Sequence, residues 1–416
     1  MSLFKAVLLS ACLARLASPA IHAAPPDAAV AALDDWLRKP AAQRPAIGSQ
    51  DFAKVPLTKE HARRAADALW KDHVESVRAS TRAEWEGREI KAVGRSMKFE
   101  TVWFGTNQPS PSGGWPLFIS MHGGGGAPAR VNDSQWRNQV RLAQSYAPKQ
   151  GLYVAPRAPT DTWNLWHEGH IDPLFARLIE SAVVLANVSP DRVYLMGYSA
   201  GGDGVYQLAP RMADWFAAAA MSAGHPNETQ PFGLRNLPFA LQVGGDDSAY
   251  NRNRIASDWA GKFQQLREAD PGGYASLVKV HAGKPHWMGM ADRIAIPWME
   301  SHVRNPLPDR VAWRQDDVLH EQFYWLAVPG GSAKAGQEVL AERKGQSFQI
   351  LRSEPPVLVL RLNDELADLD KPIEVAAGPR SLFKGVVPRT IGLLAQTLAA
   401  RGDRRLMFAS EVEVRP

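Results

Sequence analysis

The most informative stretch of the sequence is Arg192-Val193-Tyr194-Leu195-Met196-Gly197-Tyr198-Ser199-Ala200-Gly201. Its apolar first half predicts a buried strand, and the residues from 200 to 212 have the apolar spacing of a helix. The G-x-S-x-G pattern between them predicts a tight turn, because glycines let two chain segments approach closely. Such a turn presents the Ser199 hydroxyl at the sheet edge, so we interpret Ser199 as a nucleophile. The alternative is an ordinary glycine-rich turn; a phosphate-binding loop would need a Walker lysine or a G-x-G-x-x-G arrangement after the strand.

Strand and helix patterns alternate on both sides of this turn. We expect strands at 98–104, 116–121, 152–156, 192–196, 216–221, 239–243 and 275–281. Helices are expected at 132–146, 174–186, 200–212, 251–267 and 290–303. This alternation predicts an α/β domain over residues 98–308, with a mostly parallel sheet covered by helices on both faces.

The flanking segments have other patterns. Residues 24–97 predict a helical N-terminal extension, broken by Pro40, Pro45 and Pro56. After Pro308, short strands are expected at 323–328, 338–342, 347–351, 357–362 and 406–412, with a turn at Lys344-Gly345 and one helix at 391–400. We therefore expect a strand-rich, sandwich-like accessory module over residues 309–416.

A glycine run, His122-Gly123-Gly124-Gly125-Gly126, follows the buried strand that ends at Met121. Glycines leave backbone N–H groups unshielded, so this run can supply an oxyanion hole together with the N–H of Ala200. A merely flexible loop is the alternative. We choose Gly123 and Gly124 as donors, and the choice among the four glycines stays open.

An acid and a base should follow the nucleophile in chain order. The strand at 239–243 leads into Gly244-Gly245-Asp246-Asp247, which offers two adjacent acids. His286 lies on a loop between the next strand and the last helix, as the order Ser, Asp, His requires. His281 within a strand and His302 late in a helix suit packing or surface positions.

The loop from Thr160 to Asp172 is rich in aromatic and polar side chains and follows a predicted central strand. Ligands bind at the carboxyl ends of strands in open α/β sheets. We expect substrate contacts from Trp163, Trp166, His167 and Tyr198, although buried packing is an equal alternative for each tryptophan. The spacing His167-x-x-His170 with Asp172 also admits metal ligands, but it is a weak pattern, and we expect no metal and no cofactor.

These motifs resemble the α/β-hydrolase superfamily, and within it exported bacterial esterases akin to polyhydroxybutyrate depolymerases and feruloyl esterases. The resemblance covers about residues 98–303, with HGGGG, GYSAGG, GGDD and KPHWM in the expected order. It implies the α/β-hydrolase fold and favours Asp247 over Asp246, because Gly244-x-x-Asp247 resembles the acid loop of such esterases. Neither flanking segment shares it.

The implied reaction is acyl transfer through a covalent intermediate on Ser199, with His286 as base and Asp247 as its orienting acid. A small-molecule or polymeric ester is the expected substrate. The alternatives are a serine peptidase or amidase with the same triad, and a catalytically silent protein that binds a polymer.

Composition and the first residues bear on location. The 416 residues are 45% hydrophobic and 22% charged, and 48 basic against 43 acidic side chains, dispersed along the chain, do not form a nucleic-acid-binding pattern. Lys5 followed by the apolar run 6–14 predicts a signal peptide cleaved after Ala23, and the run is too short for a transmembrane helix. We expect a periplasmic or secreted protein. Lipid attachment at Cys12, the one cysteine of the chain, is the less favoured alternative.

Overall fold

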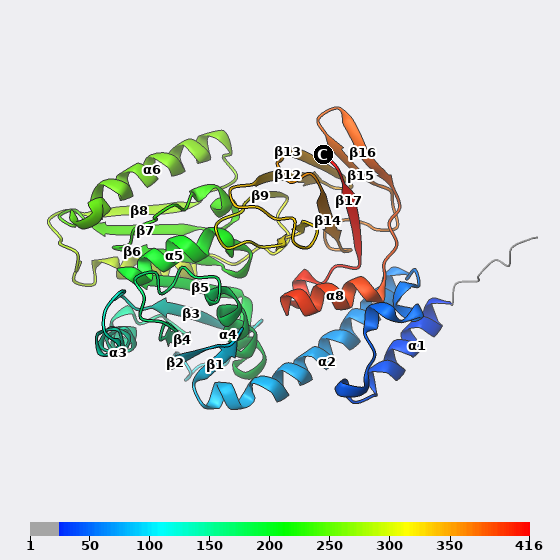
Figure 1. Ribbon diagram of the computed structural model, residues 1–416, viewed down its shortest axis with the longest axis horizontal. Helices are drawn as coiled ribbons and strands as arrows, with labels where there is room; N and C mark the ends of the chain where they lie inside the picture. The colour runs from blue at the N-terminus through cyan, green and yellow to red at the C-terminus, as the bar shows by residue number, and fades with distance from the viewer. Residues whose placement is uncertain (1–24) are drawn as a thin grey trace, which may run out of the picture.

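The computed structural model describes residues 25–416, and its largest element is an eight-stranded sheet in the order β1-β2-β4-β3-β5-β6-β7-β8 (Figure 1). The strands are β1 Glu89–Ala92, β2 Arg95–Phe104, β3 Trp115–Met121, β4 Gly151–Pro156, β5 Val188–Tyr198, β6 Ala218–Ser222, β7 Phe239–Gly244 and β8 Ser276–His281. In this order, neighbours from β4 to β8 are parallel, whereas β1, β2 and β4 pair antiparallel. The predicted mostly parallel sheet is confirmed. Strand β1 was not predicted.

Helices cover both faces of this sheet. The helices α4 Ile171–Ala186, α5 Ala200–Arg211 and α6 Arg252–Ala269 pack on one face, and α3 Ala129–Tyr146 and α7 Ala295–Glu300 pack on the other. Side chains alternate between the faces of a strand, so Leu117 and Ile119 of β3 point to the first layer and Phe118 points to the second. The near-continuous apolar runs of the central strands follow from burial on both faces.

The predicted final helix over 290–303 was wrong in its extent. Met290 has φ of +65°, which an α-helix does not accommodate, and a single 3₁₀ turn over Ala291–Ile294 precedes the short α7. Pro297 fits the first turn of α7 because no intrahelical partner is needed for its missing N–H. His302 therefore lies beyond the helix, where its carbonyl accepts a hydrogen bond from the Tyr194 hydroxyl.

The C-terminal module contains two further sheets, in the orders β10-β11-β14-β17 and β16-β15-β13-β12-β9. Its elements are β9 Arg310–Arg314, β10 Gln322–Phe323, β11 Leu326–Ala327, β12 Glu338–Lys344, β13 Ser347–Ser353, β14 Leu358–Leu362, β15 Ile373–Ala377, β16 Arg380–Gly385, α8 Ile391–Arg401 and β17 Ser410–Val414. Strands β9, β15 and β16 were not predicted. The single strand expected at 323–328 is instead two strands, because Tyr324 turns the chain with φ of +53°.

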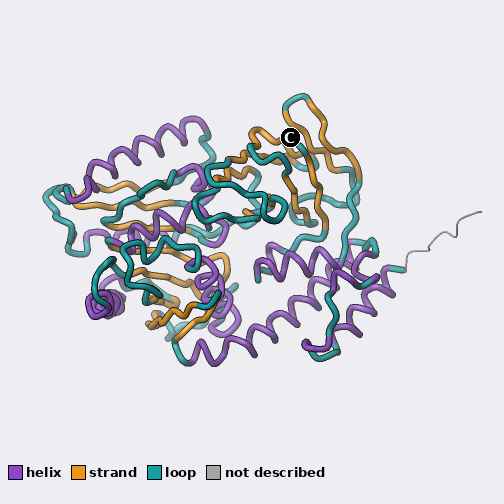
Figure 2. Tube along the Cα trace, in the orientation of Figure 1, coloured by secondary structure: helices purple, strands orange, loops and turns teal. Residues whose placement is uncertain are grey.

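The module shares a core with the large sheet. The buried apolar side chains of its strands join the same cluster as those beneath α4, α5 and α6, so one apolar core extends through both parts. Figure 2 shows the strands of the module beside the helix-covered sheet. An independently folding appendage would instead have a core of its own.

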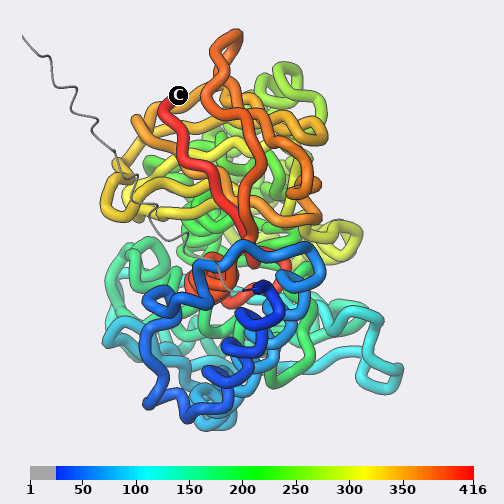
Figure 3. The backbone as a smooth tube through the Cα atoms, turned by 90° about the vertical axis from the view of Figure 1, so that its right-hand side faces the viewer, coloured from blue at the N-terminus to red at the C-terminus, as the bar shows by residue number. Residues whose placement is uncertain are grey.

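The N-terminal extension consists of α1 Pro26–Leu37, three 3₁₀ turns and the long helix α2 Lys59–Glu86. Helix α2 contacts both α4 and α8, and its apolar face forms a separate small core with α1 and α8. In Figure 3 the N-terminal segment, in blue, lies beside α8, in red. The extension therefore spans from the large sheet to the C-terminal module. None of the described helices is long and apolar enough to pass through a bilayer.

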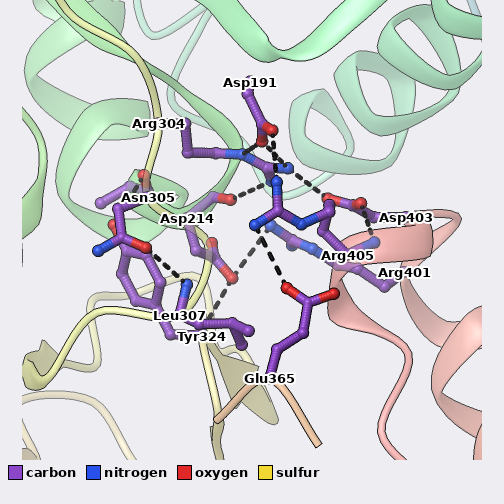
Figure 4. A network of polar contacts seen from close by, with 11 residues as sticks. Asp191, Asp214, Arg304, Asn305, Leu307, Tyr324, Glu365, Arg401, Asp403 and Arg405 are labelled. Atoms are coloured by element: carbon purple, nitrogen blue, oxygen red, sulfur yellow. Dashed lines mark hydrogen bonds and ion pairs between the residues drawn. The ribbon is translucent and has the colours of Figure 1, made fainter. Parts of the chain in front are cut away.

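A buried ionic network also joins the module to the α/β domain (Figure 4). The Arg304 guanidinium, with 2% of the side chain exposed, lies 2.8 Å from an Asp191 oxygen and 2.6 Å from an Asp403 oxygen. Arg401 of α8 lies 3.0 Å from Asp214 and covers the ring of Trp215. Buried charges need partners of opposite sign, and the Arg304–Asp403 and Arg401–Asp214 pairs each join the α/β domain to the module.

Candidate functional site

Ser199 occupies a sharp turn between β5 and α5. Its backbone has φ of +58° and ψ of −122°, a conformation that costs energy for a residue with a side chain. The glycines make the turn possible: a Cβ on Gly197 would lie 2.1 Å from the Gly201 carbonyl oxygen, and one on Gly201 would lie 2.2 Å from that of Met121. The Ser199 N–H donates to the Ser222 carbonyl at 2.9 Å, which fixes the turn against β6.

Ser199, His286 and Asp247 form a continuous hydrogen-bonded line. The Ser199 Oγ lies 3.0 Å from His286 Nε2, and His286 Nδ1 lies 2.7 Å from Asp247 Oδ2. The Asp247 side chain is 1% exposed, whereas 42% of the His286 side chain is exposed. A buried carboxylate behind a half-exposed imidazole is the arrangement in which the imidazole accepts a hydroxyl proton.

Two adjacent acids were candidates, and the structure separates them. Asp247 faces His286, and its second oxygen lies 3.6 Å from an Arg252 nitrogen. Asp246 is exposed, and its backbone N–H donates to the Lys284 carbonyl. Its contact with the His286 loop is through the backbone alone.

Tyr198 fixes the loop that carries the imidazole. Its hydroxyl donates to the His286 carbonyl at 2.7 Å and accepts from the Met288 N–H at 2.9 Å. The residue is 7% exposed, and burial raises the pKa of its hydroxyl well above the usual range. We predicted a substrate contact here; the hydroxyl is instead engaged by the base-bearing loop.

The glycine loop passes directly beside Ser199. A Cβ on Gly123 would lie 3.2 Å from the Ser199 Cβ, and Ala200 is the first residue of α5. Among residues 25–416, no hydrogen-bond acceptor engages the N–H of Gly123 or Gly124. Gly123 therefore lies beside Ser199 with an N–H that is not engaged, as an oxyanion hole requires. Which glycine N–H would bind the anion stays a prediction.

Two side chains hold the glycine loop in place. His122 donates from Nδ1 to the Gly123 carbonyl at 2.6 Å and accepts the Ala158 N–H at Nε2, and burial lowers its pKa to about 4. The ring is thus neutral and has one fixed tautomer. The amide oxygen of Asn132 accepts the Gly125 N–H at 3.1 Å, and its nitrogen donates to the Gly125 carbonyl. Asn132 was not predicted, because an asparagine near a helix start has many other uses.

The loop between β4 and α4 contributes one exposed aromatic residue. Trp163 is 60% exposed and packs its backbone against Gly125 and Gly126. Trp166 is fully buried, and its Nε1 donates to the His122 carbonyl at 3.0 Å, so the structure favours the alternative of buried packing for this residue. Gly204 of α5 makes room for this buried side chain, because a Cβ on Gly204 would lie 2.5 Å from Trp166. His167 is 7% exposed and meets Trp163 edge-on.

The metal-ligand pattern in the same loop is not assembled. His170 pairs with Glu168, whereas Asp172 pairs with Arg211 and His320. His170 and Asp172 thus have separate protein partners.

Comparison with known proteins adds a functional context. No family model matches the chain. A protein of Nocardia uniformis subsp. tsuyamanensis named "Putative esterase NocK" is 31% identical over 157 residues, which are 35% of this chain and 44% of that protein. The match thus spans less than half of the length of NocK.

Solved structures of esterases also align. A thermostable esterase aligns with 18% identity and a TM-score of 0.39, over 52% of this chain and 62% of its own. A feruloyl esterase module from Clostridium thermocellum aligns with 14% identity and a TM-score of 0.34, over 51% of this chain and 85% of its own.

Proposed function

We propose that this chain, which has the α/β-hydrolase fold, is a carboxylic ester hydrolase that uses Ser199 as its nucleophile. The observation that carries the proposal is the line Ser199–His286–Asp247, with hydrogen-bond distances of 3.0 and 2.7 Å. The similarity to NocK supports ester substrates. The serine mechanism rests on the geometry of the site.

The reaction follows from the positions of these groups. His286 Nε2 takes the Ser199 proton while Oγ attacks the ester carbonyl, and Asp247 stabilises the imidazolium that forms. The oxyanion lies beside the N–H groups of the glycine loop and Ala200. The imidazolium then protonates the leaving alkoxide, and an acyl group remains on Ser199. Water, activated by His286, releases the acid and restores the hydroxyl.

We also propose that the protein is exported. The basic residue and apolar run before Ala23 support this, and both lie outside the described residues, as does Cys12. Fractionation of cells that express the full chain tests it. A periplasmic or secreted form that begins at Ala24 is expected, and a full-length cytoplasmic form would contradict export.

Hydrolysis of p-nitrophenyl esters from acetate to palmitate tests the activity. Wild type should turn over at least the short esters, and Ser199→Ala should lose the turnover while its unfolding temperature stays near that of wild type. A folded wild type that hydrolyses no ester of the series would contradict the proposal. So would a Ser199→Ala variant with wild-type rates.

A further inference from the structure

A closed loop of the C-terminal module reaches the α/β domain. It spans Gln315 to His320, between β9 and β10. The Gln315 side chain, buried with 4% of the residue exposed, accepts the His320 N–H at 3.0 Å and donates to the His320 carbonyl at 2.6 Å. One amide thus holds both backbone groups of His320. The imidazole is presented from a fixed backbone.

The His320 imidazole binds a buried ion pair of the α/β domain. Its Nε2 lies 2.8 Å from Asp172 Oδ2, in the first turn of α4. The other Asp172 oxygen accepts from Arg211 Nη2 at 2.6 Å, and Arg211 Nη1 donates to the His167 carbonyl at 2.9 Å. The side chains of Asp172 and Arg211 are 7% and 1% exposed. Although burial opposes ionisation of Asp172, Arg211 and His320 hold its pKa below the usual value.

A second contact lies beside the first. A Cβ on Gly169 would lie 3.5 Å from a methyl carbon of Val318, so the closed loop packs directly on the segment between β4 and α4. With the His320 bond, the module holds both the end of that segment and the start of the helix that follows it.

The segment held in this way is the one that contacts the glycine loop. Asp161 accepts from Asn132 Nδ2 at 2.8 Å, and Asn132 in turn binds Gly125. The backbone of Trp163 packs on Gly126. Contacts therefore run without a gap from His320 to the loop beside Ser199.

We propose that His320 is a positioning residue for the ester hydrolysis inferred above, and that the C-terminal module serves to hold the 160–170 segment against the oxyanion loop. The inference rests on the proposed function and gives the module a role in the active site. A module that merely packs against the domain would need neither the Gln315 closure nor a hydrogen bond to a buried carboxylate.

The test compares His320→Leu with His320→Gln. Leucine removes the bond to Asp172, and glutamine retains an N–H donor. We expect His320→Leu to lower kcat for p-nitrophenyl butyrate about tenfold with a smaller change in KM, because oxyanion contacts act mainly in the transition state. His320→Gln should retain kcat within about twofold, which corresponds to less than about 0.5 kcal/mol. Rates are normalised to the fraction of sites that react with a fluorophosphonate.

His302→Leu is the matched control, because that histidine lies beyond α7, where its ring meets Trp298 edge-on and its carbonyl accepts from Tyr194. Hydrogen–deuterium exchange provides a readout that does not need activity. Amides of residues 160–170 should exchange faster in His320→Leu than in wild type or His302→Leu.

The outcomes separate the two proposals. A folded His320→Leu with wild-type kcat and wild-type exchange in the segment would overturn this inference. If His320→Leu does not fold, Gln315→Ala, which opens the closed loop, replaces it in both measurements with the same expectations. A wild type that hydrolyses no ester contradicts the proposed function, while the exchange data still decide whether His320 positions the segment.

Discussion

At the scale of single residues, the site depends on the orientation of one imidazole. Its Nδ1 faces Asp247 and its Nε2 faces Ser199. In the tautomer that carries its proton on Nδ1, the lone pair of Nε2 is free to accept the proton of Ser199. A carboxylate enforces this tautomer because it only accepts hydrogen bonds. In the proposed mechanism, Asp247 therefore determines which nitrogen can take the proton of Ser199.

Replacing this carboxylate tests its role. Asp247→Asn should lower kcat for p-nitrophenyl esters by about 10³ to 10⁴-fold, because an amide favours the wrong tautomer and does not stabilise the imidazolium. The matched control is the exposed neighbour, Asp246→Asn, which should remain within about twofold of wild type in the same assay. Equal losses in the two variants would contradict the assignment of Asp247.

At the scale of elements, the site is assembled from the ends of β3, β5, β7 and β8. Each strand end is followed by a loop that carries part of the candidate site. Tyr198 holds the loop that carries His286, and His122 and Asn132 hold the glycine loop. The loops are therefore positioned by packed elements and need little ordering when substrate binds.

Replacing Gly124 of the glycine loop tests this positioning. Gly124 has φ of +121°, and a Cβ on it would lie 2.1 Å from the Asn132 Oδ1, so Gly124→Ala must displace the loop. We expect kcat to fall about 10² to 10³-fold, the loss typical of one missing oxyanion donor. Gly261→Ala in α6, where nothing lies within 4 Å, is the control and should have wild-type kcat. Wild-type kcat in Gly124→Ala would contradict the oxyanion assignment.

The elements also explain what the sequence could predict. Strands β3, β5 and β7 have apolar runs that make their ends visible in the sequence, and the order Ser, Asp, His follows from the motifs after them. Trp163 and Trp166 lie in one loop three residues apart, and no local pattern distinguishes the exposed ring from the buried one. Short edge strands such as β1, Glu89–Ala92, have too few apolar residues to show a period.

At the scale of the whole molecule, three chain segments form one structure. The C-terminal module shares its core with the α/β domain, and the Arg304 network joins them across the boundary. A charge buried in this way is tolerated only while its partners are present.

Removing one carboxylate of the Arg304 network measures how much the network stabilises the fold. Asp403→Ala leaves the buried Arg304 with Asp191 as its remaining carboxylate partner, and we expect the free energy of unfolding to fall by about 3 kcal/mol. Asp368→Ala removes an exposed pair with Lys371 and should lower the free energy of unfolding much less than Asp403→Ala, because solvent screens an exposed pair. Urea unfolding of both variants provides the comparison. Equal midpoints would contradict a stabilising role for the network.

The most direct test of the central claim is covalent labelling of purified wild type with a fluorophosphonate, followed by peptide mass spectrometry. If Ser199 is the nucleophile, wild type should carry one adduct per chain, located on Ser199. Labelling should be slower in Asp247→Asn and absent from folded Ser199→Ala. A folded wild type that takes up no label, or an adduct located on another residue, would contradict Ser199 as the nucleophile.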